Sequence, residues 1–294
     1  MIADMTTPTI EAKPVLTRNF LLGEGPLWDE RRECLFFVDI DAGEAFRYVP
    51  GEPEARLIYS GPKVGGMTLE EDGRLVLFRE DDLAALDPET GRLESRPAPD
   101  DPERSRFNDA IALPDGSVLV GVIAKPGATG RLWRFSSNGS QPVPGCESSI
   151  GNGLALTRHA DSVLWTDTPG RRLLRLGIGP NGELGEPEPA YSVPDRPEEG
   201  FPDGLTADSE GRLYSARWAG GSVVMLDPPG MGKAGRVVVA TENVTSAAFG
   251  GPELSTLYVT TAGSTLYAAE FGRQGVPECR SRLYGSTGIR VRSS

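Results

Sequence analysis

The sequence predicts an all-β protein, a six-bladed β-propeller with four-stranded antiparallel blades, on three observations. One pattern of short apolar strands occurs six times along the chain. Turn pairs such as Asp72-Gly73 and Asp115-Gly116 lie between apolar runs, which is a strong short-range signal of a hairpin. Helical periodicity is nearly absent, and 37 Gly and 25 Pro are spread over the 294 residues, as expected of many strands joined by tight turns.

Each repeat begins with a small or acidic residue and continues through two apolar strands, a Gly-rich link and a third strand. Successive repeats start 41, 44, 43, 51 and 43 residues apart, which is the spacing of propeller blades. A large β-sandwich with coincidental spacing is the alternative, but a sandwich does not require one pattern six times. The repeats begin at Glu24, Gly65, Asp109, Asn152, Asp203 and Ser246.

The chain divides into a flexible N-terminal leader, residues 1–14, and a single propeller domain, residues 15–294. We expect residues 15–22 to form a strand beside the last repeat, because closure of the ring removes exposed sheet edges. The longest interval between repeats contains residues 180–200, which are rich in Pro, Gly and Glu and predict a surface loop.

Composition excludes several classes of function. A net charge of −12 argues against a nucleic-acid partner, since neutralising phosphates requires a basic face. The sequence lacks the roughly 18 consecutive apolar residues of a membrane span and a secretory signal. Three cysteines without short-range pairing favour a reducing compartment, so we expect a cytoplasmic protein with structural cysteines, either a monomer or a weak homo-oligomer.

The chain contains one histidine, His159, in a polar turn between two strands. Ser-His-Asp and Cys-His schemes, and most zinc sites, are therefore excluded. Any chemistry must depend on carboxylates, amides and a metal bound by oxygen.

Carboxylates and an amide recur at the residue that opens the repeats. In a propeller the first strand of each blade lines the central channel, so Glu24, Asp109, Asn152 and Asp203 converge at one mouth. Each residue could alternatively open a turn, where Asp and Asn are common, but four of six repeats share the feature at one phase. Crowded carboxylates require a cation or a retained proton. All donors are oxygen atoms, which suit Ca²⁺, Mg²⁺ or Mn²⁺.

These motifs resemble those of the SMP-30/gluconolactonase/luciferin-regenerating-enzyme-like family, from about residue 16 to residue 261. The motifs are LGEGPLWD around Glu24, RFNDA around Asn108, NGLALT at Asn152, PDGLTAD at Asp203 and FGGPELSTLYVTTA downstream. One departure concerns the strand after RFNDA, where many members have a GTM-type stretch followed by acidic residues. This chain has Lys125 and Pro126 there, so the identity of the sugar cannot be transferred.

The resemblance implies that Glu24, Asn152 and Asp203 ligate one divalent cation. Ca²⁺ is the first choice, with Mg²⁺, Mn²⁺ and Zn²⁺ as alternatives. It also implies that Arg106 and Asn108 bind the substrate and that Asp109 lies near the metal without ligating it. The alternative for Arg106 and Asn108 is that neither binds a ligand: Arg106 would be a surface arginine and Asn108 a turn asparagine.

The predicted activity is metal-dependent hydrolysis of a sugar (aldono-) lactone to the aldonic acid. Asp203 is the first candidate for the general base and Asp109 the second. Arg106 and Asn108 would orient the sugar hydroxyls. The alternatives are a phosphotriesterase or aryl-ester hydrolase with the same metal site, and a non-catalytic propeller that binds a metal and a ligand. Trp218 is the tryptophan that could line the pocket, whereas the other three are expected to pack within the blades.

Overall fold

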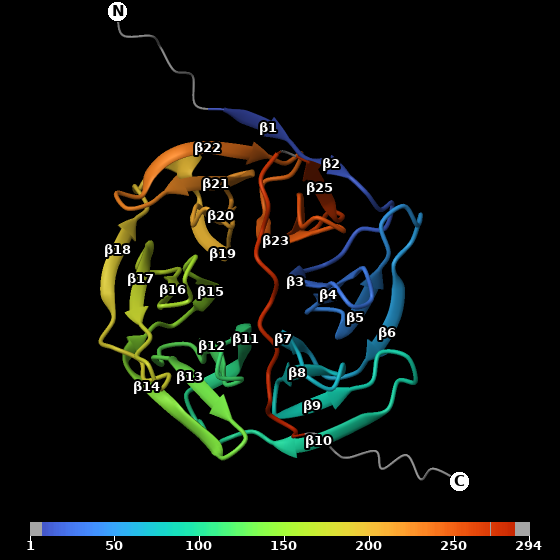
Figure 1. Ribbon diagram of the computed structural model, residues 1–294, viewed down its shortest axis with the longest axis vertical. Coiled ribbons are helices and arrows are strands. Elements are labelled where there is room, and N and C mark those ends of the chain that lie inside the picture. Colours follow the sequence, from blue (N-terminus) through green and yellow to red (C-terminus); the bar gives the residue numbers. More distant parts are fainter. Residues whose placement is uncertain (1–7, 271, 286–294) are drawn as a thin grey trace, which may run out of the picture.

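Six β-sheets surround a common axis in the computed structural model, which describes residues 8–270 and 272–285 (Figure 1). The prediction of a six-bladed β-propeller is therefore confirmed. A single 3-10 turn, η1 (Pro197–Glu199), is the only helical element in these ranges. No helix in the described chain is long and apolar enough to cross a membrane.

Each blade is a meander in which consecutive strands pair antiparallel from the channel outward. The strands of the first three blades are β3 (Gly23–Asp29), β4 (Cys34–Asp39), β5 (Glu44–Tyr48), β6 (Arg56–Ser60), β7 (Val64–Leu69), β8 (Leu75–Arg79), β9 (Asp82–Leu86), β10 (Leu93–Pro97), β11 (Arg104–Ala112), β12 (Val118–Ala124), β13 (Arg131–Ser136) and β14 (Gly139–Glu147). Those of the last three are β15 (Gly151–Leu156), β16 (Ser162–Asp167), β17 (Arg172–Gly177), β18 (Glu188–Ser192), β19 (Phe201–Ala207), β20 (Leu213–Trp218), β21 (Ser222–Asp227), β22 (Gly232–Val238), β23 (Val244–Gly250), β24 (Thr256–Thr261) and β25 (Tyr267–Glu270).

The apolar core is divided among the contacts between adjacent blades. The second strands are buried on both faces because each lies between two neighbouring blades, as in Cys34–Asp39. Phe78 of blade 2 meets Phe107 of blade 3 edge to face, with ring centroids 5.7 Å apart. The six separate clusters hold the inner strands in place around the channel.

The N-terminal chain closes the ring, but the closing strand lies earlier than predicted. β2 (Lys13–Pro14) pairs antiparallel with β25, and residues 15–22 follow as a connection joined to the last blade by a bridge between Leu22 and Ala262. β1 (Thr9–Glu11) pairs parallel with β22 and gives blade 5 a fifth strand. Both strands lie within the predicted leader, residues 1–14, and pair with outer strand edges that were available; residues 1–7 lie outside the described residues.

The C-terminal segment was not assigned by the sequence analysis. Residues 272–285, called the strap, run across the channel from blade 6 to blade 2 (Figure 1). Gly275 forms a bridge with Asp208 and Ser281 forms one with Glu70, at the ends of the inner strands β19 and β7. The strap thus covers the channel mouth at which the inner strands end, called the strap end.

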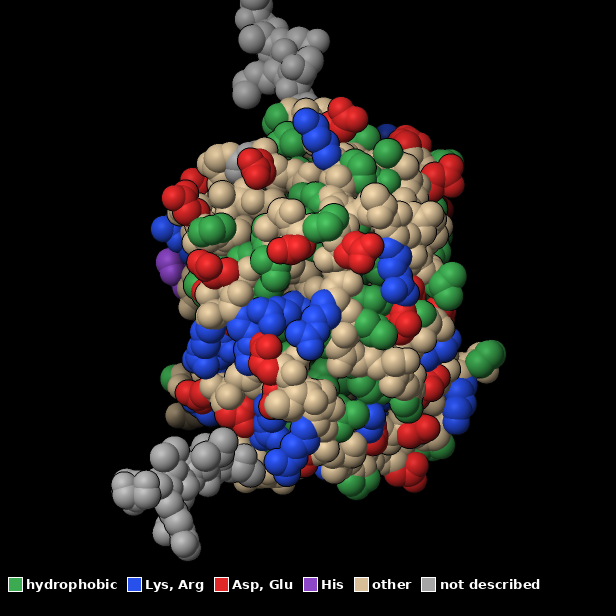
Figure 2. All heavy atoms as spheres, turned by 90° about the vertical axis from the view of Figure 1, so that its right-hand side faces the viewer, with side chains coloured by type: hydrophobic (Ala, Val, Ile, Leu, Met, Phe, Trp, Pro, Cys, Tyr) green, Lys and Arg blue, Asp and Glu red, His purple; other side chains and the backbone are tan. Residues whose placement is uncertain are grey.

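Charged side chains of both signs lie on the face that Figure 2 presents, where some of the Lys and Arg side chains gather into one patch. Many are paired, for example Lys63 with Asp41 at 2.7 Å and Arg131 with Glu103 at 3.0 Å. Surface pairs of this kind contribute little stability each.

Candidate functional site

The opposite channel mouth, called the site end, is where every inner strand begins. Because neighbouring strands are antiparallel, each second strand ends there too. Residues from both positions, with the loops between blades, surround a pocket of about 480 Å³. Its lining consists of Leu22, Glu24, Arg106, Asn108, Ile123, Ile150, Asn152, Thr168, Pro169, Phe201, Asp203 and Trp218.

Four polar side chains form the floor of this pocket. Glu24, Asn108, Asn152 and Asp203 are 9%, 4%, 7% and 5% exposed. They come from four different blades, and Arg106 extends beside them. The structure therefore brings together the five residues that the sequence predicts for the metal and the substrate, although their roles remain predictions.

Close approach of two inner strands depends on a glycine. A Cβ on Gly153 would lie 2.4 Å from the backbone oxygen of Asp203, so a larger residue would push β15 away from β19. Gly153 follows the floor residue Asn152, and Asp203 is itself a floor residue. The NGL and DGL sequences thus place Asn152 and Asp203 beside each other.

Hydrogen bonds link the floor into one chain. Arg106 Nη1 donates to Asn108 Oδ1 at 2.6 Å, and Asn108 Nδ2 donates to Asn152 Oδ1 at 2.9 Å. Asn152 Nδ2 donates to Thr168 Oγ1 at 3.1 Å, and that hydroxyl donates to Pro202 O at 2.8 Å. The two amides are consequently fixed in orientation before any ligand binds.

The two floor carboxyls lack comparable partners. Among the described residues, Glu24 Oε2 accepts one hydrogen bond, from the neighbouring Gly25 N–H at 3.1 Å. Asp203 Oδ1 is buried without a hydrogen-bond partner among the described residues. Burial raises the pKa of Glu24 to about 8, with the Asp109 charge adding to the effect. Burial, and then the charges of Glu24 and Asp109, also raise the pKa of Asp203, and Arg106 offsets only part of this.

Asp109 does not line the pocket. It is the extra residue of a β-bulge between Asn108 and Ala110, with φ +36°. The corresponding residue of blade 1 is Gly25, which follows Glu24 and has φ +52°. Asn108, rather than Asp109, therefore shares the structural phase of Glu24 and Asn152. The bulge turns the Asp109 side chain into a lower cavity of about 70 Å³, which Glu278 of the strap also lines.

Burial raises the pKa of Asp109 to about 6 and that of Glu278 to about 7. Asp109 is thus separated from the pocket at the site end, although its charge acts on Glu24 and Asp203. The placement in the lower cavity does not support the prediction of Asp109 as a second candidate base.

Several pocket residues were missed by the sequence analysis, and one, Trp218, was left open. Thr168 follows β16, and its place could have been inferred because the second strand of a blade ends beside the start of the first. Trp218 ends β20 in the same way and lines the pocket, as was considered. On the second strand of blade 3 the pocket residue is Ile123, whereas Lys125 beyond it is exposed and donates to Pro102 O at 2.8 Å.

The histidine and the buried cysteines lie outside the pocket. His159 is exposed in its turn, as predicted. Cys34 and Cys146 are buried in blade interfaces, and burial raises their pKa to about 11 and about 12. Such thiols are unreactive, which agrees with a structural role.

The floor is suited to a divalent cation. Its available donors are carboxylate and amide oxygens, including the unpartnered Asp203 Oδ1. A cation there would offset the repulsion between the Glu24 and Asp203 carboxylates and supply the partner that the buried oxygen lacks.

This chain belongs to the SMP-30/gluconolactonase/LRE-like family, whose model matches residues 22–263. It is 38% identical to pentonolactonase XacC of Haloferax volcanii over 243 residues, 82% of each protein. It is 30% identical to 6-deoxy-6-sulfogluconolactonase of Pseudomonas putida over 287 residues, 92% of this chain and 98% of that protein. A solved structure of a calcium-binding regucalcin from Agrobacterium tumefaciens superposes with a TM-score of 0.85 at 22% identity, covering 94% of this chain and 98% of the other, and shows the shared fold.

Proposed function

We propose that this protein hydrolyses a sugar lactone to its aldonic acid in a reaction that depends on one divalent cation. The observation that carries the proposal is the pair of buried carboxyls, Glu24 and Asp203, beneath an open pocket, with one Asp203 oxygen lacking a partner. The lactonase activities named for the two relatives above support a lactone as the substrate.

Glu24, Asn152 and Asp203 would hold the cation, with Ca²⁺ as the first choice. When bound, the cation would act as a Lewis acid that polarises the lactone carbonyl and stabilises the oxyanion formed by attack. The regucalcin structure named as calcium-binding is consistent with this choice.

Arg106 positions the substrate in this proposal. Its Nη1 is engaged by Asn108 Oδ1 and Phe107 O, whereas Nε and Nη2 have no hydrogen bond to a described residue. These free donors can hold a substrate hydroxyl. Asn108 Nδ2 donates to both Gly151 O and Asn152 Oδ1, so this amide can only accept a further hydrogen bond and mainly holds its neighbours in place.

Asp203 is the proposed general base. It removes a proton from a water molecule as the water oxygen attacks the carbonyl carbon, giving a tetrahedral intermediate. Collapse of this intermediate breaks the bond to the ring oxygen, which takes up a proton to become the hydroxyl of the product. The lactone and one water are thereby converted to one hydroxy acid.

The test is hydrolysis of a panel of aldonolactones, measured by acid release before and after chelation and after addition of Ca²⁺, Mg²⁺, Mn²⁺ or Zn²⁺. We expect activity to disappear on chelation and to return with at least one ion. Glu24→Gln should weaken cation affinity at least tenfold, because it removes a charge and keeps the shape, while the exposed Glu253→Gln serves as control.

Full activity after thorough chelation would refute the dependence on a cation. Turnover of aryl esters or phosphotriesters without turnover of any lactone would favour the alternative hydrolase. Cation binding without turnover of any of these substrates would favour a binding protein.

A further inference from the structure

The walls of the pocket differ in character from its floor. Above the floor, the lining residues of blades 3, 4 and 5 and of the connection before blade 1 are apolar except for Thr168. The apolar residues are Leu22, Ile123, Ile150, Pro169, Phe201 and Trp218. Blades 3 to 5 supply all of these except Leu22, and we call those five residues the apolar wall.

The apolar wall is held in a fixed arrangement. Ile123 and Ile150 are joined by an antiparallel bridge between their backbones. The loop that carries Ile150 is fixed by Ser148, whose hydroxyl donates to Asp167 Oδ1 at 2.7 Å and accepts the Ile150 N–H at 3.2 Å. These contacts give the wall a defined shape before a ligand enters.

The opposite part of the wall is fixed through β19 and β20. Phe201 is paired in register with Trp218. The guanidinium of Arg171 lies 4.6 Å from the Phe201 ring centroid and donates to Pro194 O and Gly200 O. Phe201 is nevertheless 42% exposed, which leaves an aromatic surface open at the rim.

Hydrogen-bonding capacity is scarce along this wall. The Thr168 hydroxyl is already used by Asn152 and Pro202 O. Among the described residues, the Trp218 indole N–H is the one wall donor without a partner that could reach a ligand. By contrast, Arg106 on the floor retains free donors, and the charges of Asp41 and Glu80 lie near it on the side of blades 1 and 2.

A hydroxyl pressed against the aliphatic part of this wall, Ile123 and Ile150, would lose its water without gaining a side-chain hydrogen bond. Burial of an unpaired hydroxyl costs about 1 to 3 kcal/mol in proteins, which corresponds to roughly 5- to 150-fold in an equilibrium or rate ratio. A methyl or methylene group in the same place would gain contact instead.

We propose that this site selects a lactone of amphipathic shape. The hydroxyls of its ring face Arg106 and the floor, and its exocyclic arm, lacking a terminal hydroxyl, lies against Ile123, Ile150 and Trp218. The preferred substrate class is therefore a deoxy or alkyl-substituted aldonolactone. This inference rests on the proposed function and narrows its substrate.

The test compares a hexono-1,4-lactone with its 6-deoxy analogue, since the two differ by one hydroxyl. With the cation-loaded protein we expect kcat/KM to be roughly 10- to 100-fold higher for the deoxy lactone. Ile123→Thr and Ile150→Thr each place a hydroxyl on the wall and should reduce this preference at least threefold. Val238→Thr, on the outer strand of blade 5, is the matched control and should leave the preference unchanged.

A binding measurement keeps the test independent of turnover and of variant folding. The other tryptophans, Trp28, Trp133 and Trp165, are 2%, 7% and 1% exposed, so acrylamide quenching of the wild-type protein reports mainly on Trp218. Lactam analogues of the two lactones should protect this fluorescence, the deoxy lactam with a dissociation constant roughly tenfold lower.

Equal kcat/KM for the two lactones, or a preference for the hydroxylated one, would overturn this inference and leave the proposed function standing. Equal protection of Trp218 by the two lactams would overturn it as well. Hydrolysis of neither lactone by the cation-loaded protein would overturn the proposed function, and this inference with it.

Discussion

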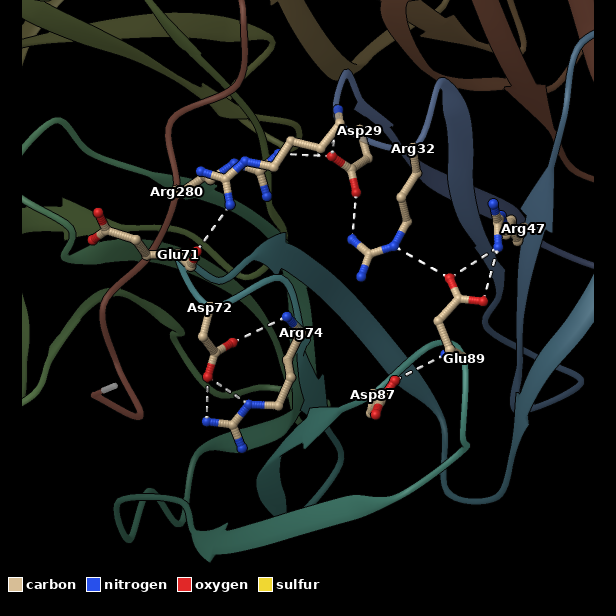
Figure 3. Close-up of polar contacts among 10 residues, drawn as sticks. Asp29, Arg32, Arg47, Glu71, Asp72, Arg74, Asp87, Glu89 and Arg280 are labelled. Carbon is tan, nitrogen blue, oxygen red and sulfur yellow. Dashed lines mark hydrogen bonds and ion pairs between the residues drawn. The ribbon is translucent and has the colours of Figure 1, made fainter. Parts of the chain in front are cut away.

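Buried carboxyls stand at both ends of the channel, and their surroundings are opposite. At the strap end, Asp29 is fully buried and accepts Arg32 Nη1 at 2.6 Å and Arg280 Nη2 at 2.7 Å (Figure 3). Glu70 there accepts the Ser281 hydroxyl at 2.5 Å and the Tyr284 N–H at 2.8 Å. At the site end, Asp203 Oδ1 has no partner among the described residues.

The pKa values of Asp29 and Glu24 are shifted in opposite directions, which agrees with this contrast. Burial alone would raise the pKa of Asp29, but the hydrogen bonds and charges of Arg32 and Arg280 outweigh it and lower the value. Burial raises the pKa of Glu24 to about 8, and the nearby Arg106 does not compensate. Two acids on one inner strand, β3, thus differ because, among the described residues, only Asp29 is paired with arginine side chains.

Figure 3 shows how far the pairing extends at the strap end. Arg32 also contacts Glu89, which Arg47 shares from β5. Carboxylates in such a network contribute to stability, whereas unpaired carboxylates facing an open pocket are typical of a functional site. The comparison can be tested by changing matched residues at the two ends.

The largest effect is expected for Asp203→Asn. The substitution keeps an oxygen donor but cannot accept a proton, so kcat should fall on the order of 10²-fold or more. Stability of the cation-free protein at pH 7 should not fall, because burial and the neighbouring carboxyls already disfavour the charged form of Asp203. Steady-state kinetics at confirmed cation occupancy and thermal unfolding would check both; near-normal kcat in a cation-loaded variant would place the base elsewhere.

Arg280→Ala should give the opposite outcome at the strap end. Removing one of the two cations on buried Asp29 should lower the free energy of unfolding by about 1 to 3 kcal/mol at pH 7, with kcat/KM unchanged. The native pKa of Asp29 is lowered, so its stabilisation is complete above the unfolded value and is lost as the pH falls through the native value. Denaturant unfolding should therefore show the loss shrinking below about pH 4; a loss of activity at full stability would contradict the distinction between the ends.

The smallest effect is expected for Arg106→Ala, the site-end counterpart of that change. Loss of a hydroxyl-binding guanidinium should raise KM roughly tenfold and lower kcat less, which is the signature of lost uniform binding. Thermal unfolding should change little, because Arg106 makes no salt bridge with a described residue. An unfolding loss as large as that of Arg280→Ala would show that Arg106 is structural.

Much of the fold, and most of the pocket floor, could be predicted from the amino-acid sequence. The repeated strand pattern predicts six blades, and because inner strands start at one mouth, the phase of the repeat brings Glu24, Asn152 and Asp203 together. Asp109 and Ser246, which both begin repeats in the sequence pattern, line the lower cavity instead. For Asp109 the reason is that a bulge residue with positive φ leaves no mark in an alternation of apolar residues. The lower cavity it faces could not be predicted for the same reason.

What the sequence determined by itself is local and periodic: strand length, turn chemistry and the channel-facing position of each repeat. Only the tertiary structure decided how the ring closes through β2, how the strap pairs with Asp29 and Glu70, and which side of the pocket is apolar. The ring closure and the strap contacts join residues more than 100 positions apart, such as Arg280 with Asp29. Contacts of that range arise from packing of the finished blades, and no short-range pattern encodes them.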